Sequence, residues 1–304
     1  MSENRIKYRH LQCFLEIVQQ GSVIRAADVL SLTQPAVSKT LKELEEILDA
    51  RLLERNKKGI ELTKFGHLFL EHASTSLAAL REGTEKVAEA LQQRAHKLSI
   101  GVLPTVATSV LPSAVKHFRE SDTTTRLHLS SGPNALLMSQ LRVGELDLVV
   151  GRLGVPEAMA GLHFEHLYSE QIVFAVRPSH PLVNKPDFQL ADICDYPILY
   201  PPQESITAPT VDAFLLSQDI TNIKDRIDTV SDSFGKEFIR NNDAIWAISR
   251  GVVAREIESK ELCELPIDTK ETLSAVGLTT RSGPENIAAL GQFIEAVKRV
   301  TASY

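Results

Sequence analysis

The chain has few cysteines and no long apolar run, and each shortage excludes a class of protein. Its 304 residues include three cysteines, Cys13, Cys194 and Cys263, which lie far apart and fit reduced thiols better than a disulfide framework. A redox pair between Cys194 and Cys263 stays open as an alternative, although two buried thiols are favoured. No apolar stretch approaches about 18 residues, so no transmembrane helix is expected. The first residues, MSENRIK, lack the apolar core of a secretory signal, and we expect a cytoplasmic protein.

Motifs of the common enzyme and metal-binding classes are also missing. No GxGxxG or Walker loop opens a predicted helix, and no nucleophile–base constellation stands out. His67, Glu71 and His72 have the wrong spacing for the HExxH and HxxEH zinc motifs. His163 and His166 border a predicted strand, where a metal site is the less favoured interpretation. We therefore predict no enzyme, no catalytic residues, no metal and no bound cofactor.

Charge is distributed unevenly along the chain. The net charge is −6, but residues 1–64 hold 11 Lys+Arg against 9 Asp+Glu and are therefore slightly basic. The remainder is acidic, with a net charge of −8. Because an acidic body is repelled by nucleic acid, the N-terminal segment is the side on which DNA could dock.

Two short helices joined by a tight turn are predicted just inside this basic segment. Ser22 can cap the first helix, and Ser31 and Leu32 form the turn. Thr33 can cap the second helix, which has Pro35 in its first turn, where the missing N–H costs little.

The second of these helices has two different faces. Apolar residues recur at spacings of 4, 3 and 4 and predict a buried side: Val37, Leu41, Leu44 and Leu48. The opposite side carries short or basic hydrogen-bonding groups: Gln34, Ser38, Lys39 and Lys42. Such a narrow polar face is typical of a helix in a DNA major groove, the alternative being an ordinary solvated face.

A preceding helix, a hairpin and a long helix complete the N-terminal third. Leu11, Phe14, Leu15 and Val18 give the preceding helix its apolar stripe, and Gly21 ends it. Residues 52–63 predict a hairpin with a basic tip at residues 56–59. A helix that Thr63 can cap follows over residues 64–93 and is roughly 45 Å long. One side of the long helix carries a stripe that predicts pairing with a second chain: Phe65, Leu68, Phe69, His72, Leu80, Val87 and Leu91.

From residue 97 the pattern alternates between strands and helices, which predicts a parallel sheet flanked by helices. The expected strands span residues 98–103, 126–130, 146–151, 172–176, 198–200, 244–248 and 273–279. The expected helices span residues 109–119, 134–143, 211–218, 232–241 and 284–300. This is enough material for two α/β lobes.

The N-terminal pattern resembles the DNA-binding domain of LysR-type transcriptional regulators. The likeness rests on Leu11, Phe14, Ala26, Ala27, Leu30, TQPAVS at 33–38, Leu41, Leu44, Glu45, LLER at 52–55, Leu62, Thr63 and Gly66. It continues through IG at 100–101, LP at 111–112, Leu141, GELD at 144–147 and SHPL at 179–182, and so covers nearly the whole chain. Within the family, GVLPTV at 101–106 and LDLVVGRL at 146–153 resemble activators of the protocatechuate (pca) catabolic operon, with regulators of sugar-binding-protein genes as neighbours.

The resemblance implies an α plus α/β architecture. It comprises a winged helix-turn-helix at residues 1–63, a dimerising linker helix at 64–94, and an effector domain at 95–304 similar to type 2 periplasmic binding proteins. Lobe I is expected at 95–167 and 270–304, and lobe II at 168–269, with the chain crossing near residues 167–171 and 265–273. Family members usually act as tetramers made of two dimers, bind imperfect palindromic double-stranded DNA, bend it and contact RNA polymerase.

The expected DNA contacts follow from the resemblance and from side-chain chemistry. Gln34 can read adenine, and Lys39 can reach guanine or a phosphate. The family often has arginine at the position of Lys39, so a bidentate guanine contact is in doubt there. The full set of expected DNA-binding residues is Ser22, Arg25, Thr33, Gln34, Pro35, Ser38, Lys39, Lys42, Arg55, Lys57 and Lys58.

The expected effector site lies between the lobes. The matching positions are Thr105, Asn134, Arg152 and Pro201, each at the carboxyl end of a strand or the amino end of a helix, where ligands bind in open α/β sheets. Arg152 can hold a carboxylate bidentately, or it can form a structural ion pair. Thr105 and Asn134 can bind the ligand or simply cap helices. Ser231 and Ser233 are weaker candidates, and Trp246 is more typical of a core.

These residues predict a small organic acid as effector. The finer resemblance implies an acid of the protocatechuate or carboxymuconate type, and hence an activator of an aromatic-acid catabolic operon. One alternative is the same class of regulator sensing a sugar or sugar acid. The other is a small-molecule binding protein without a DNA function, which the basic helices disfavour.

Overall fold

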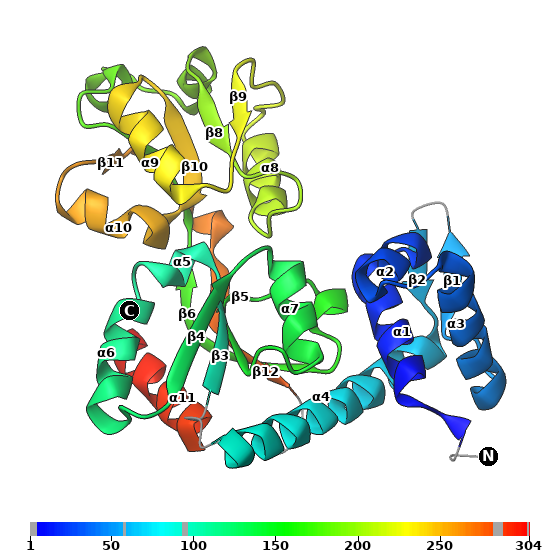
Figure 1. Ribbon diagram of the computed structural model, residues 1–304. Coiled ribbons are helices and arrows are strands. Elements are labelled where there is room, and N and C mark those ends of the chain that lie inside the picture. The colour runs from blue at the N-terminus through cyan, green and yellow to red at the C-terminus, as the bar shows by residue number, and fades with distance from the viewer. Residues whose placement is uncertain (1–4, 57–58, 93–96, 282–287, 303) are drawn as a thin grey trace.

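The computed structural model describes residues 5–56, 59–92, 97–281, 288–302 and 304. Figure 1 shows an N-terminal helical domain, a long helix, and two α/β lobes stacked one above the other. Among the described residues, we found no helix with the length and apolar character needed to span a bilayer.

The N-terminal domain is a three-helix core followed by a hairpin. The elements are α1 (Tyr8–Gln20), α2 (Val23–Leu30), α3 (Gln34–Leu48), β1 (Leu53–Asn56) and β2 (Gly59–Leu62). Phe14, Ile17, Ala26, Val37 and Leu44 are fully buried where the helices meet. The apolar spacings of the sequence therefore mark the buried faces, and the hairpin is the expected wing, with Leu53 opposite Leu62.

Two of the three predicted helix caps are formed, at Ser22 before α2 and at Thr63 before the long helix that follows the hairpin. The backbone N–H of Arg25 donates to the Ser22 hydroxyl at 3.4 Å, and that of Gly66 donates to the Thr63 hydroxyl at 3.0 Å. The prediction for Thr33 was wrong, since Thr33 occupies the cap position of α3 without a side-chain bond. A cap accepts from the second or third helical N–H, and the second helical residue here is Pro35, which has none.

The long helix α4 (Lys64–Gln92) uses one face and leaves another open. Leu70, Ala73 and Leu77 pack into the core of the N-terminal domain. Large apolar side chains remain exposed on the other face: Phe65, Leu68, Leu80 and Val87. The apolar stripe that predicted pairing with a second chain is thus only partly buried within one chain.

Lobe I is a five-stranded sheet in the order β4-β3-β5-β12-β6. Its strands are β3 (Lys97–Val102), β4 (Arg126–Ser131), β5 (Leu148–Arg152), β6 (Leu162–Glu170) and β12 (Ser274–Arg281). Its helices are α5 (Pro104–Ala107), α6 (Leu111–Ser121), α7 (Asn134–Arg142), η2 (Pro156–Met159) and α11 (Ala288–Thr301). The buried apolar clusters place α6 and α11 on one face of the sheet and α7 on the other (Figure 1).

Lobe II repeats this plan with the strand order β11-β7-β10-β8-β9. Its strands are β7 (Ile172–Val176), β8 (Ile198–Tyr200), β9 (Arg226–Asp228), β10 (Ile245–Ser249) and β11 (Cys263–Glu264). Its helices are η3 (Pro181–Asn184), η4 (Leu190–Asp195), α8 (Ala208–Ser217), α9 (Asp232–Asn241) and α10 (Arg250–Glu258), with η5 (Lys270–Thr272) on the return to lobe I.

The sheets are mixed, which corrects the expectation of parallel ones. Strands β3, β4 and β5 are parallel, as are β8, β9 and β10. However, β12 is antiparallel to both β5 and β6, and β7 is antiparallel to β10. The reason is that β6 leads out of lobe I and β12 returns to it, so these two strands must run in opposite directions. The short strands β9 and β11 and the helix α10 were not predicted.

The two crossings between the lobes are fastened to one another. The chain passes from β6 to β7 at Gln171 and returns through η5 to β12. The Ile172 N–H donates to the Thr272 hydroxyl at 2.9 Å, and the Thr269 hydroxyl donates to the Ile172 carbonyl at 2.6 Å. Because these bonds are buried, they hold both crossings together.

Candidate functional site

The outward face of α3 matches the predicted polar face. Thr33, Gln34, Pro35 and Lys39 are exposed, and Ser38 is half-buried. Lys42 is exposed and lies beside Glu46 on the same helix, with Nζ 3.6 Å from Oε1. An exposed pair of this kind is weak, so the ammonium of Lys42 can exchange Glu46 for a phosphate.

The other residues expected to contact DNA lie at the start of α2, in β1 or outside the described residues. Ser22 and the exposed Arg25 begin α2. Arg55 lies in β1, where its backbone pairs with Ile60. Lys57, Lys58 and the side chain of Arg55 lie outside the described residues.

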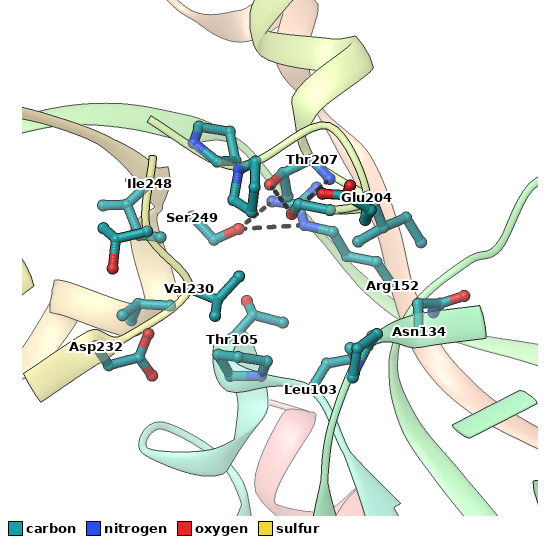
Figure 2. Close-up of a pocket in the computed structure, with 18 of the residues that line it drawn as sticks. Leu103, Thr105, Asn134, Arg152, Glu204, Thr207, Val230, Asp232, Ile248 and Ser249 are labelled. Atoms are coloured by element: carbon teal, nitrogen blue, oxygen red, sulfur yellow. Dashed lines mark hydrogen bonds between the residues drawn. The ribbon is translucent and has the colours of Figure 1, made fainter. Parts of the chain in front are cut away.

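A cavity of about 490 Å³ lies between the two lobes. Lobe I contributes the segment that follows β3, the last residue of β5 and the amino end of α7 with the loop before it. Lobe II contributes β10 and the loops before α8 and α9. Thr105, Asn134, Arg152 and Pro201 all line it, so the structure brings together four positions that are far apart in the sequence. Figure 2 shows the first three of them.

Arg152 has no N–H group to spare. Nε and Nη2 donate to the Ser249 hydroxyl at 3.3 and 3.0 Å, and Nη2 also donates to Glu170 Oε2 at 3.4 Å. Nη1 donates to the Glu170 carbonyl at 3.4 Å and to the Ser274 hydroxyl. A guanidinium has five N–H groups, and these bonds use five. Arg152 is also only 3% exposed, so the structure favours a structural ion pair over a free carboxylate clamp.

Glu170 joins this arginine to both lobes. Its carboxylate accepts the Thr105 hydroxyl from lobe I and the Gly251 N–H, at 2.5 Å, from lobe II. Burial raises the pKa of Glu170, and the charge of Arg152 opposes that shift. The network of Arg152, Glu170, Thr105, Ser249 and Gly251 therefore ties the lobes together beside the cavity. Thr105 is engaged in this network instead of being free for a ligand.

Asn134, unlike Arg152 and Thr105, has a side-chain group without a hydrogen-bond partner in the described part of the chain. It is the first residue of α7, and it is only 9% exposed. Its side-chain amide nitrogen is buried and makes no hydrogen bond with any described residue. Buried donors are almost always paired, so an unpaired one on a cavity wall indicates a bound group that accepts a hydrogen bond.

Ser231 and Ser233 are not among the residues that line the cavity, which corrects their assignment. The Ser231 hydroxyl caps α9 by accepting the Phe234 N–H at 3.3 Å, and Ser233 is exposed. Asp232, between them, does line the cavity. The sequence gives no signal for this residue, because an acid in the first turn of a helix is usually explained by the helix dipole.

Trp246 is both a core residue and part of the cavity wall. It is 1% exposed, and it forms part of the cavity wall. The chain contains a single tryptophan, so its fluorescence reports on this cavity.

The helix α7 connects the cavity to the long helix. Its amino end carries Asn134, and just beyond its carboxyl end Val143 packs into the core cluster that holds Leu70 and Leu77 of α4. Arg81 of α4 bonds Glu145 at 2.8 Å. A change at the cavity end of α7 can thus reach the helix that carries the N-terminal domain.

The part of the chain that the structure describes gives little support for a metal site or for a redox-active cysteine. No group of three or more His, Cys, Asp or Glu there could hold a metal ion. Cys13, Cys194 and Cys263 are free, and burial raises the pKa of each thiol. A raised pKa lowers the fraction of reactive thiolate, which disfavours a redox role.

Comparisons with known proteins agree with this arrangement. Residues 8–67 match the family described as bacterial regulatory helix-turn-helix protein, lysR family, and residues 91–302 match the LysR substrate binding domain. The chain belongs to the LysR family. It is therefore a DNA-binding transcriptional regulator with an effector-binding domain, and it is not an enzyme, as predicted.

Individual relatives of this LysR-type regulator cover nearly its full length. The transcriptional regulator PcaQ of Agrobacterium fabrum is 43% identical over 299 residues, which is 98% of this chain and 96% of that protein. Full-length LysG of Corynebacterium glutamicum with bound effector Arg has a TM-score of 0.59 at 19% identity, covering 98% of this chain and 99% of that one. Full-length CbnR with its target DNA has a TM-score of 0.54 at 22% identity, covering 97% and 100%. These two structures show the shared fold, and PcaQ shows the nearer kinship.

Proposed function

We propose that this LysR-type regulator activates an aromatic-acid catabolic operon of the protocatechuate type in response to a small carboxylate bound between its lobes. The kinship with PcaQ supports the pathway. The observation that carries the effector site is the unpaired Asn134 amide, buried in the wall of the cavity between the lobes.

The chemistry of the cavity favours a carboxylate at the Asn134 end. The amino end of α7 adds free backbone N–H groups and positive potential to the side-chain amide. A cavity of about 490 Å³ is of the size that takes a small organic ligand. These features support an effector of the protocatechuate or carboxymuconate type, with Asn134 as its hydrogen-bond donor.

On the DNA side, we propose that α3 enters the major groove of an imperfect palindromic operator. Gln34, Ser38 and Lys39 would face base edges and phosphates, since they share the outward face of α3. Arg25 and the wing residues Arg55, Lys57 and Lys58 would contact the backbone.

The assembly follows from the open face of α4. Its exposed side chains, Phe65, Leu68, Leu80 and Val87, support a dimer formed through this helix, with two dimers making a tetramer on the two operator halves. Contact with RNA polymerase in the cytoplasm completes the proposal.

We further propose that the signal travels by a population shift. The effector would favour one arrangement of the lobes, and α7 would pass the change to α4 through Val143 and the Arg81–Glu145 pair. The angle between the two DNA-binding domains, and hence the bend of the operator, would change with it.

A thermal-shift screen of the full-length protein tests the effector class. The panel contains protocatechuate, carboxymuconates, benzoate and sugar acids. A ligand at about 100 times its Kd should stabilise the protein by about 2.7 kcal/mol. The shift should vanish in Asn134→Ala and persist in Asn184→Ala, an exposed asparagine of lobe II that does not line the cavity. A shift with sugar acids alone would contradict the aromatic-acid assignment.

A further inference from the structure

The cavity has an unmatched acceptor as well as an unmatched donor. Asp232 begins α9, lines the lobe II wall and is half-buried. Its carboxylate makes no hydrogen bond with any other described residue. In Figure 2 it stands on the side of the cavity opposite Asn134. A carboxylate in such a place can accept hydrogen bonds from a ligand.

The groups around Asp232 leave it free to do so. Lys236, one turn further along α9, is committed to Glu256, with Nζ 2.8 Å from Oε1, and both partners are largely buried. Burial raises the pKa of Asp232, the charge of Lys236 lowers it, and the charge of Glu256 raises it. Asp232 thus faces the cavity as an acid without a dedicated cation.

The charged groups that line the cavity also favour a ligand with a single carboxylate. Arg152 is neutralised by Glu170, and Asp232 adds a carboxylate to the cavity wall opposite Asn134, whereas the exposed Glu204 lies on the Arg152 side (Figure 2). A ligand with negative charge at both ends would place one end against Asp232. A ligand with a carboxylate at one end and hydroxyl groups at the other would satisfy both unmatched groups.

Building on the proposed function, we infer that the effector is a hydroxylated aromatic monocarboxylate and that Asp232 is the residue that selects it. The carboxylate lies toward Asn134 and the amino end of α7, and a ring hydroxyl donates to the Asp232 carboxylate. Apolar side chains of the cavity lining accept the ring: Leu103, Val230 and Ile248. Dicarboxylates and tricarboxylates of similar size are rejected by the charge of Asp232.

This arrangement predicts a strong dependence on the hydroxyl groups. A hydrogen bond to an ionised group contributes about 1.5–3 kcal/mol, or roughly 10- to 150-fold in affinity. A site built around such a bond rejects the analogue that lacks the hydroxyl, because its acceptor is then left unpaired.

Isothermal titration calorimetry on the full-length protein tests the inference, with Trp246 fluorescence as a second readout. The ligands are 3,4-dihydroxybenzoate, benzoate and 3-carboxymuconate. We expect the wild type to bind 3,4-dihydroxybenzoate at least about ten-fold more tightly than either of the others. In Asp232→Asn, 3,4-dihydroxybenzoate should bind more weakly and 3-carboxymuconate more tightly. Glu237→Gln, on the same helix but outside the cavity lining, should behave as the wild type.

The outcomes separate this inference from the function on which it rests. If benzoate or 3-carboxymuconate binds the wild type as tightly as 3,4-dihydroxybenzoate, the selection by Asp232 is overturned while the carboxylate effector stands. The ligand series in the wild type decides this even if Asp232→Asn fails to fold. If none of the three acids binds, the aromatic-acid function itself falls.

Discussion

The outward face of α3 and the cavity between the lobes are both polar surfaces, but they are prepared differently for their ligands. On α3, the polar groups come from one short segment, and Gln34 and Lys39 stand exposed to solvent. In the cavity, the polar groups come from segments more than 100 residues apart, and most are already paired. In a buried site, a polar group without a hydrogen-bond partner among the described residues, such as the Asn134 amide, indicates where a ligand binds. A charged group that is already paired, such as Arg152, does not.

Arg152 gives the largest expected effect and the sharpest contrast with α3. In Arg152→Ala, Glu170 would remain buried without its cation, so the free energy of unfolding should fall by about 3–5 kcal/mol. Denaturant unfolding of the full-length protein measures this change. Arg299→Ala is the matched control, because Arg299 is 68% exposed and pairs with Glu120 at 3.8 Å, and it should change the same free energy by less than about 1 kcal/mol.

The opposite result for Arg152 would revise the site. If Arg152→Ala keeps its stability but loses the response to effector, Arg152 is a ligand clamp and the pairing with Glu170 is dispensable.

Gln34→Ala should act on sequence choice alone. Gln34 is exposed on α3 and has no structural partner among the described residues, so its loss should cost about 1–3 kcal/mol of discrimination at one base pair and leave stability unchanged. Binding to operators substituted at each position measures the effect.

The wing residues should affect binding to every DNA sequence, whereas Gln34 should affect the choice of one base pair. Lys57→Ala combined with Lys58→Ala should weaken binding to every operator and lower the salt slope by about 1–2. An unchanged slope would remove the wing from the DNA interface.

The smallest expected effect separates two threonines that look alike in the sequence. Thr63 caps α4, so Thr63→Ala should destabilise the N-terminal domain by about 1 kcal/mol. Thr33 makes no cap bond, so Thr33→Ala should cost no capping energy. Thermal unfolding of the two variants side by side measures the difference, and equal losses would contradict the assignment of the caps.

The N-terminal domain could be predicted from the sequence more completely than the α/β lobes. The helices of the N-terminal domain follow from apolar spacing and from Gly21, Ser22 and Thr63, which act locally, and so the sequence was sufficient for them. The antiparallel strands β6 and β12 depend on the return of the chain from lobe II, which no local pattern records.

Within the cavity, the lining positions could be predicted but the state of each side chain could not. Arg152 is occupied by Glu170, Ser249 and Ser274, which lie 18 to 122 residues away in the chain. Asp232 lines the cavity and its neighbours Ser231 and Ser233 do not, a distinction that depends on how the first turn of α9 is oriented toward the cavity.

The most direct test of the account is a DNase I footprint of the full-length regulator on its operator, with and without 3,4-dihydroxybenzoate, in the wild type and in Asn134→Ala. We expect the acid to change the footprint of the wild type and to leave that of Asn134→Ala unchanged, while both proteins occupy the operator equally well without ligand. If Asn134→Ala responds at the same concentration as the wild type, the effector does not bind at the amino end of α7, and the proposed cavity is not the effector site.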